Sequence, residues 1–424
     1  MLQVSILREE KDRAIQGLKK RRLPNVEQSV DGILDLDLKR RQTQQQQDAL
    51  LAEANAVARE IGNLMKSGKK EEAETLKAKT AQMKKQIADL GIELSSTEEE
   101  LQKVLYTLPN VPNVKVPEGG GPDDNVVVHE NGQVPALPAD ALPHWDLIRK
   151  YDIIDFELGI KIAGAGFPVY KGKGAKLQRA LINFFLDEAE KQGYREMQPP
   201  IVVNEASGYG TGQLPDKEGQ MYHVQLDNLY LIPTAEVPIT NLYRDVILTE
   251  ETLPVKNVGY TPCFRREAGN WGAHVRGLNR LHQFDKVEIV QITTAENSYR
   301  ALEEMAAYVQ GLLEKLELPY RKLLLCGGDM GFTSAMTYDM EVYSAAQKRW
   351  LEVSSVSNFE TYQANRLKLR YKNKDGKTQL LHTLNGSALA LPRIVAAILE
   401  NNQTEGGIKI PRALKPYLNF EVID

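Results

Sequence analysis

Two heptad seams near the start of the chain constrain its fold more than any other feature. The first runs from Leu36 to Leu64, with seam residues spaced alternately four and three apart, and the second runs from Ala73 to Leu101 with a similar alternation. Between them lies Ser67-Gly68-Lys69, which is typical of a turn. Heptad helices joined by so short a turn fold back on each other. The sequence therefore predicts an antiparallel coiled-coil hairpin over about residues 30–105.

The register of this hairpin follows from its turn. If Leu64 faces Ala73, then Ile61 faces Leu76, and the seam is apolar near the turn and more polar farther away. At ~1.5 Å per residue the hairpin is roughly 40–45 Å long, so we expect it to project as an arm. The pattern leaves two purposes open. One is a dimerisation or spacer element, and the other is a contact arm whose lysine and arginine clusters would suit a nucleic acid.

Proline and glycine usage divides the chain into three predicted regions. Residues 1–110 form the helical arm region, where Pro24 is the one proline before residue 109. Residues 111–145 are rich in both breakers and are predicted to be a linker with one short strand at Val126–Val128. From residue 146 to 424 strand-like and helix-like segments mix, which is typical of an α/β or α+β catalytic domain.

Composition excludes several classes of protein. The 424 residues carry a net charge of -4, so the chain is not basic throughout, and 42% hydrophobic residues allow a sizeable core. Cys263 and Cys326 are too few for a disulfide framework. No stretch approaches the ~18 apolar residues of a membrane span, and the charged start of the chain is not a secretory signal. We therefore expect a cytoplasmic protein with no membrane partner.

Three polar constellations in the second half of the chain carry the candidate chemistry. The first is Thr234-Ala235-Glu236, which follows a strand-like segment. The second extends from Cys263 to Glu288, and the third runs from Leu351 to Asn358 and resumes at Leu384, ending with Arg393 before an apolar helix. The motifs of phosphate-binding P-loops, zinc proteases and nucleophile-elbow hydrolases are absent from the sequence, which argues against those classes.

The constellations resemble the motifs of class II aminoacyl-tRNA synthetases. Phe264-Arg265-x-Glu267 resembles motif 2, Gly386 to Arg393 resembles motif 3, and a predicted helix from Ala175 to Gly193 before Pro199-Pro200 resembles motif 1. Further blocks narrow the resemblance to the seryl-tRNA synthetase family, and they are Thr234-Ala235-Glu236, His282 to Glu288, Ser354 to Phe359, Gly208 to Pro215 and Gly328 to Gly331. The resemblance covers the whole chain, the arm included.

This resemblance implies an α+β fold, with an N-terminal antiparallel coiled-coil arm before a class II catalytic domain built on a mostly antiparallel sheet. It implies that the protein activates serine with ATP to seryl-adenylate and pyrophosphate. Serine would then pass to the 3′ end of tRNA(Ser), and of tRNA(Sec) where one exists. The family further implies a homodimer formed through motif 1 and Mg²⁺ bound with ATP. Zinc is not expected, because two isolated cysteines and the Thr234-Ala235-Glu236 motif argue against a zinc-bound serine site.

The expected nucleotide site depends on charge and position, because activation places multiple negative charges around the ATP α-phosphate. A forked guanidinium suits phosphate, so Arg265 would hold the α-phosphate and the serine carboxylate, and Arg393 the γ-phosphate. These two arginines are the expected catalytic residues, and Glu352 with Ser355 would bind Mg²⁺. The full set expected to bind ATP is Arg265, Arg266, Glu267, Leu281, Phe284, Glu352, Val353, Ser354, Ser355 and Arg393.

Serine is small, so its selection must come from its hydroxyl group. A buried carboxylate that needs a hydroxyl donor would reject alanine, and Glu288 is the expected acceptor with Ser387 as its partner. Thr234 and Glu236 would take the ammonium group. The full set expected to bind serine is Thr234, Ala235, Glu236, Arg265, Glu288, Asn385 and Ser387.

Some residues depart from the family pattern or have plainer alternatives. Departures occur at Arg266, Trp271, Ala273-His274-Val275, Val356 and Leu391-Pro392. Arg280 is a third candidate near the nucleotide or a surface charge, and Phe284 stacks on adenine or is a core residue. Two rival functions are a paralogue that loads a carrier protein and a catalytically silent scaffold. The long arm argues against the first, and retention of the motif arginines and glutamates argues against the second.

Overall fold

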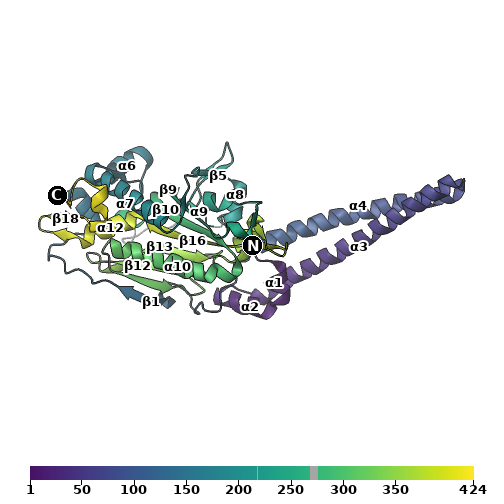
Figure 1. The fold of residues 1–424 in the computed structure, drawn as a ribbon, viewed down its shortest axis with the longest axis horizontal. Coiled ribbons are helices and arrows are strands. Elements are labelled where there is room, and N and C mark those ends of the chain that lie inside the picture. The colour runs from purple at the N-terminus through teal and green to yellow at the C-terminus, as the bar shows by residue number, and fades with distance from the viewer. Residues whose placement is uncertain (217, 268–275) are drawn as a thin grey trace. The chain divides into compact units, whose positions relative to one another are not determined.

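The computed structural model describes residues 1–216, 218–267 and 276–424. The chain forms two compact units, and Figure 1 labels their main helices and strands. The helical unit holds residues 2–19 and 23–109, and the larger unit holds Met1, residues 20–22 and residues 110–424. The domain bounds expected at residues 110 and 145 stay a prediction.

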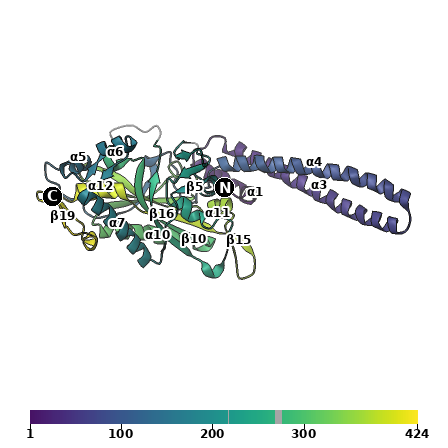
Figure 2. The same ribbon diagram turned by 90° about the horizontal axis from the view of Figure 1, so that it is seen from above.

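The helical unit is a long hairpin of two helices, α3 (Val26–Lys66) and α4 (Lys70–Thr107), preceded by α1 (Val4–Glu9) and α2 (Lys11–Lys20). Figures 1 and 2 both show α3 and α4 side by side. Every residue of the two predicted seams is buried or half-buried, whereas most residues between them are exposed. Gly68 in the turn has φ +80°, which glycine adopts without strain. The predicted antiparallel hairpin is confirmed.

A buried aspartate holds the base of this hairpin. The Asp37 side chain is 3% exposed and accepts hydrogen bonds from Arg8 on α1 at 3.0 Å, from Arg40 at 3.1 Å and from Arg41 at 3.0 Å. Burial alone would raise the pKa of Asp37, but the three arginines outweigh burial and hold its pKa below the usual range. The ionised carboxylate therefore stabilises the packing of α1 on α3.

The larger unit is built on an eight-stranded sheet. Its strand order is β1-β11-β12-β13-β16-β10-β9-β4, and every neighbouring pair is antiparallel except β9 with β4. The strands, in that order, are Val126–Asn131, Tyr320–Leu324, Met336–Ser344, Arg349–Asn358, His382–Ala390, Gln283–Thr293, Val255–Phe264 and Arg195–Glu196. The predicted mostly antiparallel sheet is confirmed. The short strand expected at Val126–Val128 is β1, at the edge of the sheet.

Three helices seal one face of this sheet. Alternate strand residues such as Val287, Ile289, Met340 and Leu384 form one apolar core with α7 (Gly172–Lys191), α10 (Ala295–Lys315) and α12 (Leu391–Asn401). Because strand side chains alternate between faces, the intervening residues point to the opposite side. That second face carries charged and hydroxyl side chains, and α9 (Glu236–Asn241) and α11 (Thr361–Leu367) pack beside it. We call it the polar face.

The remaining elements connect or flank this sheet. They are α5 (His144–Lys150), β2 (Ile154–Asp155), α6 (Phe156–Ala163), β3 (Val169–Tyr170), β5 (Val202–Asn204), α8 (Glu205–Thr211), β6 (His223–Val224), β7 (Leu229–Leu231), β8 (Ile247–Thr249), β14 (Arg370–Lys372), β15 (Thr378–Leu380), β17 (Gln403–Thr404), β18 (Gly407–Lys409) and β19 (Val422–Ile423). Short 3-10 helices are η1 (Pro122–Asp124), η2 (Glu250–Thr252), η4 (Gly277–Asn279) and η5 (Arg412–Tyr417). In the part of the chain that the structure describes, none of the helices combines the length and apolar character needed to cross a bilayer.

Replacing Asp37 by asparagine is expected to destabilise the helical unit by about 1–3 kcal/mol at pH 7, because partly exposed arginines lose a charged acceptor. The pKa of Asp37 is lower in the folded than in the unfolded protein. The stabilisation that Asp37 contributes is therefore present above a pH of ~3.9 and fades as the pH falls further. Urea unfolding monitored by helical circular dichroism at pH 7 and pH 3 measures this. The exposed neighbour Asp35→Asn is the matched control. An equal loss for Asp37→Asn at both pH values would contradict the assignment.

Candidate active site

A β-bulge in β13 brings the two expected metal ligands to one face of the sheet. Asp339 on β12 pairs with Ser355, but Glu341 pairs with Glu352, so β13 contains one residue more than its partner over this stretch. In a regular strand, residues three apart point to opposite faces; the extra residue cancels this difference. Glu352 and Ser355 therefore share the polar face with Asp339.

A second bulge in β16 does the same for the expected serine site. Lys286 pairs with Ala390 and Glu288 pairs with Ser387, so β16 also contains an extra residue here. Ser387 consequently lies directly opposite Glu288, and Asn385 points to the same face two residues earlier. The sequence contained all of these residues, but the bulges that set their directions were not predicted.

Glu288 is the centre of a buried polar cluster. Its side chain is 3% exposed, its Oε2 lies 2.6 Å from the Lys286 ammonium, and the Ser387 hydroxyl donates to the same oxygen at 3.4 Å. The expected pairing of Ser387 with Glu288 is present. Lys286 is a residue for which the sequence analysis gave no role, although period-two alternation with Phe284 and Glu288 places it on the same face. Pairing with this ammonium offsets part of the cost of burying the Glu288 carboxylate.

Glu236 lies near Glu288 and is a second buried carboxylate. It begins α9, accepts a hydrogen bond from Gln363 Nε2 at 2.6 Å, and is hydrogen-bonded to Asn385. Burial, and then the negative charge of Glu288, raise the pKa of Glu236 to about 7. Thr234 is also buried, and its hydroxyl accepts the Glu236 backbone N–H at 3.2 Å. The structure thus brings together the residues expected to bind an ammonium group and those expected to bind a hydroxyl.

Arg265 lies at the end of β9, above an aromatic ring. Its guanidinium carbon is 5.2 Å from the centroid of the Phe284 ring, and its Nε donates to the Pro233 carbonyl at 3.4 Å. Phe284 is half-buried and packs against the core, so it has both a core side and a side facing Arg265. This distance is that of a cation–π contact, so Arg265 lies next to the ring expected to contact adenine.

The other residues in and near motif 2 that were expected to bind ATP differ in the contacts that they make. Glu267 was expected to bind ATP, and its carboxylate forms an ion pair with Arg280. The Arg266 backbone N–H donates to the Gln220 carbonyl at 2.9 Å. The Leu281 side chain belongs to the apolar core, so only its backbone is free to make the contact with ATP that was expected of this residue. Trp271 and Ala273-His274-Val275 lie outside the described residues.

Arg393 extends from the first turn of α12 to the Glu352 side of the polar face. Its Nη1 donates to the Glu352 carbonyl at 2.6 Å and lies 3.8 Å from the Glu352 carboxylate, while its Nε donates to the Asn279 carbonyl at 3.2 Å. Two neighbours on β13 point elsewhere. Val353 is part of the apolar core, and Ser354 is buried with its hydroxyl donating to the Ser387 carbonyl at 2.6 Å. Their side chains are not at the polar face.

The residues around Glu352 present several oxygen atoms, which are the ligand type that hard divalent cations prefer. The Ser355 hydroxyl donates to the Asp339 carboxylate, a residue missing from the expected site. Burial and the nearby Glu352 charge raise the pKa of Asp339 well above its usual range. Glu352 is about half exposed and can turn toward a ligand. Among the described residues no group of three or more His, Cys, Asp or Glu has the geometry of a metal site.

The raised pKa of Glu236 gives a test of the buried cluster. Because its pKa is higher in the folded than in the unfolded protein, ionising Glu236 costs the folded state stability as pH rises from about 4.5 to about 7. Glu236→Gln keeps the acceptor for Gln363 but never ionises. It should therefore raise the melting temperature at pH 8, corresponding to about 1–3 kcal/mol, and change it little at pH 4. Thermal unfolding with the exposed Glu190→Gln as control checks this. The same gain at both pH values would contradict it.

Comparison with known proteins agrees with this geometry over the whole chain. The family model for the class II tRNA synthetase core domain (G, H, P, S and T) matches residues 222–402, and that for the seryl-tRNA synthetase N-terminal domain matches residues 1–112. Serine–tRNA ligase of Salinibacter ruber is 51% identical over 393 residues, which are 92% of each chain. Serine–tRNA ligase of Methylacidiphilum infernorum is 47% identical over 425 residues, which are 100% of each chain.

Solved structures give the same result. The seryl-tRNA synthetase of Pyrococcus horikoshii, crystallised with ATP, is 34% identical, with a TM-score of 0.93 over 100% of this chain and 99% of its own. The cytoplasmic serine–tRNA ligase of Naegleria fowleri, crystallised with AMP, is 25% identical with a TM-score of 0.88 over 100% and 99%. Both family models and the full-length relatives therefore lead to one assignment: the chain belongs to the seryl-tRNA synthetase family of class II aminoacyl-tRNA synthetases.

Proposed function

We propose that this chain is an ATP-dependent serine–tRNA ligase that forms seryl-adenylate and then charges tRNA(Ser). The observation that carries the proposal is the buried Glu288, which pairs with Lys286 at 2.6 Å and faces Ser387 on the polar face. A buried anionic acceptor rewards a ligand hydroxyl and leaves an unpaired carboxylate when alanine binds instead. Membership of the family agrees with this choice of amino acid.

The remaining serine contacts follow from the same cluster. Glu236 and Thr234 bind the ammonium group, and Ala235 and Asn385 complete the wall around it. Above a pH of about 7 Glu236 is ionised, so it attracts the serine ammonium electrostatically. Arg265 binds the serine carboxylate and directs it at the ATP α-phosphate. One carboxylate oxygen attacks phosphorus while pyrophosphate leaves, so the step needs orientation and charge rather than a protein acid or base.

ATP lies across the other half of the polar face. Phe284 stacks on the adenine, with contacts from Glu267, Arg266 and the Leu281 backbone. Arg393 binds the γ-phosphate, and Arg265 stabilises the charge that develops at the α-phosphate. Because Val353 and Ser354 have buried side chains, they contribute to this site through their backbone.

Glu352 and Ser355 are the residues that would hold Mg²⁺. Their shared face, created by the β13 bulge, and their hard oxygen atoms fit that ion. Mg²⁺ bound there would neutralise charge on the ATP phosphates. The Asp339 carboxylate accepts a hydrogen bond from the Ser355 hydroxyl and so fixes its orientation. The lone pairs of the Ser355 oxygen therefore point away from Asp339. No zinc takes part in the proposed reaction.

The helical unit is the proposed tRNA-binding arm. α3 alone has 41 residues, or ~60 Å of helix, which suits an extended polyanion better than a small substrate. The proposed partner is tRNA(Ser), and tRNA(Sec) where one exists, with serine passing to the 3′ end. We also propose a homodimer formed through α7 and the strand that follows it, acting in the cytoplasm where the tRNA is found.

Serine-dependent exchange of pyrophosphate into ATP, measured with each amino acid in turn, tests the proposed function. The wild type should respond to serine alone, and the serine KM of Glu288→Ala should rise at least tenfold, since a charge-assisted hydrogen bond contributes about 1.5–3 kcal/mol. Its KM for ATP should hardly change, because Glu288 lies in the serine half. Response to a different amino acid would overturn the assignment. Unchanged serine kinetics in Glu288→Ala would show that Glu288 does not bind serine.

The arm is expected to serve tRNA charging and not adenylation. A variant that replaces Arg40 to Thr97 with a short Gly/Ser turn removes a hairpin that buries its own seam. Pyrophosphate exchange should therefore persist while tRNA charging collapses. Filter binding of tRNA to the wild type should weaken steeply with salt, and the deletion should flatten that slope. Near-normal tRNA charging by the deletion variant would show that the arm is a spacer and does not bind tRNA. Charging of a carrier protein instead of tRNA would favour the rival paralogue.

A further inference from the structure

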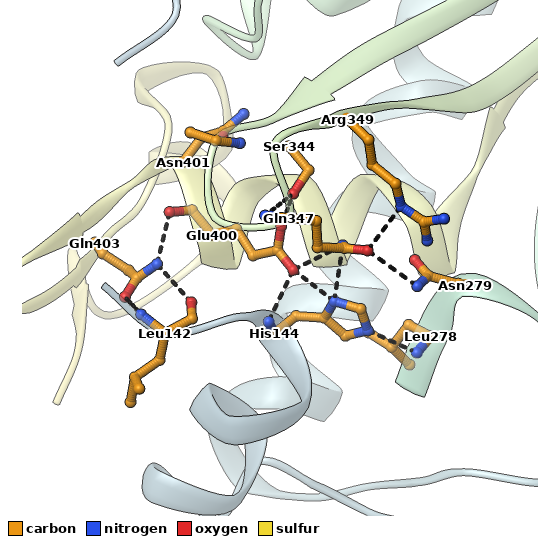
Figure 3. A network of polar contacts seen from close by, with 11 residues as sticks. Leu142, His144, Leu278, Asn279, Ser344, Gln347, Arg349, Glu400, Asn401 and Gln403 are labelled. Carbon is orange, nitrogen blue, oxygen red and sulfur yellow. Dashed lines mark hydrogen bonds and ion pairs between the residues drawn. The ribbon is translucent and has the colours of Figure 1, made fainter. Parts of the chain in front are cut away.

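A buried carboxylate near the end of α12 anchors a polar network behind the ATP half of the site (Figure 3). Glu400 is fully buried, and its Oε1 accepts from the His144 backbone N–H at 2.8 Å, from the His144 ring at 2.7 Å and from Gln347 Nε2 at 2.9 Å. Its Oε2 accepts from the Ser344 hydroxyl. The His144 Nε2 accepts from the Leu278 backbone N–H at 2.8 Å, so the proton of the neutral ring is on Nδ1. Glu400 is thus a well-satisfied, fixed acceptor.

The side-chain amide of Gln347 links Glu400 to residues that lie nearer the active site. With its amide nitrogen on Glu400, its amide oxygen accepts from Asn279 Nδ2 at 3.2 Å and from Arg349 Nε at 3.1 Å. Figure 3 shows Gln347 between these groups, with Glu400 on one side and Asn279 and Arg349 on the other. Only a side chain that both donates and accepts can make these contacts. Glutamate would repel Glu400, and leucine would make none of them.

Asn279 completes the path to Arg393. The Asn279 carbonyl accepts from Arg393 Nε at 3.2 Å, and its side chain is the group that Gln347 holds. Arg393 lies in the first turn of α12 and Glu400 near its last residue, Asn401. This chain of hydrogen bonds therefore links Glu400, near the C-terminal end of α12, to Arg393 in the first turn of the same helix. It fixes the guanidinium from outside the helix, while the helix fixes its Cα.

We propose that Gln347 is a positioning residue for the two arginines, Arg393 and Arg349, and that it sets the Arg393 guanidinium for the γ-phosphate of ATP. The inference rests on the proposed function, because that function assigns Arg393 to the γ-phosphate. A phosphate-binding guanidinium contributes only when its fork is correctly oriented, and a small misplacement lowers the rate strongly. Burial lowers the pKa of Arg349, and the nearby charge of Arg393 lowers it further, although Glu400 opposes both.

A ligand that lacks the outer phosphates separates positioning from general stability. Seryl sulfamoyl-adenosine mimics the adenylate but has no β- or γ-phosphate. For Gln347→Leu we expect the KM for ATP and the KM for pyrophosphate each to rise tenfold or more, which corresponds to about 1.4 kcal/mol. The serine KM and the dissociation constant of the adenylate analogue should stay within about twofold of the wild type.

Gln403→Leu is the matched control. Gln403 donates to the Leu142 carbonyl at 2.8 Å and to the Glu400 carbonyl at 2.9 Å, so it lies in the same network but has no link to Asn279 or Arg393. This variant should keep wild-type ATP kinetics even if it lowers the melting temperature. Asn279→Ala, which removes the group that Gln347 holds, should reproduce the phosphate-specific loss and provides a second route if Gln347→Leu folds poorly.

A double-mutant cycle with Arg393→Ala completes the test. If Gln347 acts through Arg393, adding Gln347→Leu to Arg393→Ala should raise the KM for ATP by less than twofold more. Additive losses, equal loss of analogue affinity, or the same ATP defect in Gln403→Leu would each overturn the inference. A wild type without serine-dependent exchange would instead show that the proposed function is wrong, so the two failures are distinguishable.

Discussion

The site depends on a sheet whose two faces have opposite character. Three helices cover one face with an apolar core, and the charged and hydroxyl side chains of the candidate site lie on the opposite face. A regular strand cannot place Glu352 and Ser355, or Ser387 and Ala390, on one face, because each pair is three residues apart. The bulges in β13 and β16 remove this restriction. The residues of the proposed adenylation reaction meet because both central strands are irregular at the same level of the sheet.

This arrangement has an electrostatic consequence. The sheet and the elements beside it bury two carboxylates, Glu236 and Glu288, with one ammonium, Lys286, close to them. The cluster lacks one positive charge when both carboxylates are ionised, and the rise in the pKa of Glu236 to about 7 is the physical sign of that deficit. In the proposed reaction, the ammonium group of serine supplies the missing positive charge. The empty site therefore lowers the folding stability of the protein, and binding of the ligand restores it. Such a loss of folding stability in favour of binding is common at functional sites.

The sequence was a good guide to the parts of the protein that repeat or that carry motifs. The seam from Leu36 to Leu64 predicted its buried positions, because a heptad pattern directly encodes which side of a helix is covered. The pairing of Ser387 with Glu288 was also expected.

Other features were outside the reach of sequence reasoning. Lys286 was within a quoted motif, yet its ion pair with Glu288 could not be assigned without knowing the burial of both residues. Asp339, Gln347 and Glu400 carry no local motif, and they meet the site only through strand pairing or long-range packing. Bulges were missed because one extra residue leaves no trace in the alternation of such short polar segments. The roles of the motif residues stay predictions.

The central claim is that one adenylate binds across the polar face, with its serine hydroxyl at Glu288 and its adenine at Phe284. A crystal structure of the full chain with seryl sulfamoyl-adenosine tests this most directly. The account predicts the hydroxyl within hydrogen-bond distance of Glu288 and Ser387, the ammonium beside Glu236, and the sulfamoyl group at Arg265. An analogue bound with its serine group away from Glu288, or on the helix-covered side of the sheet, would contradict it.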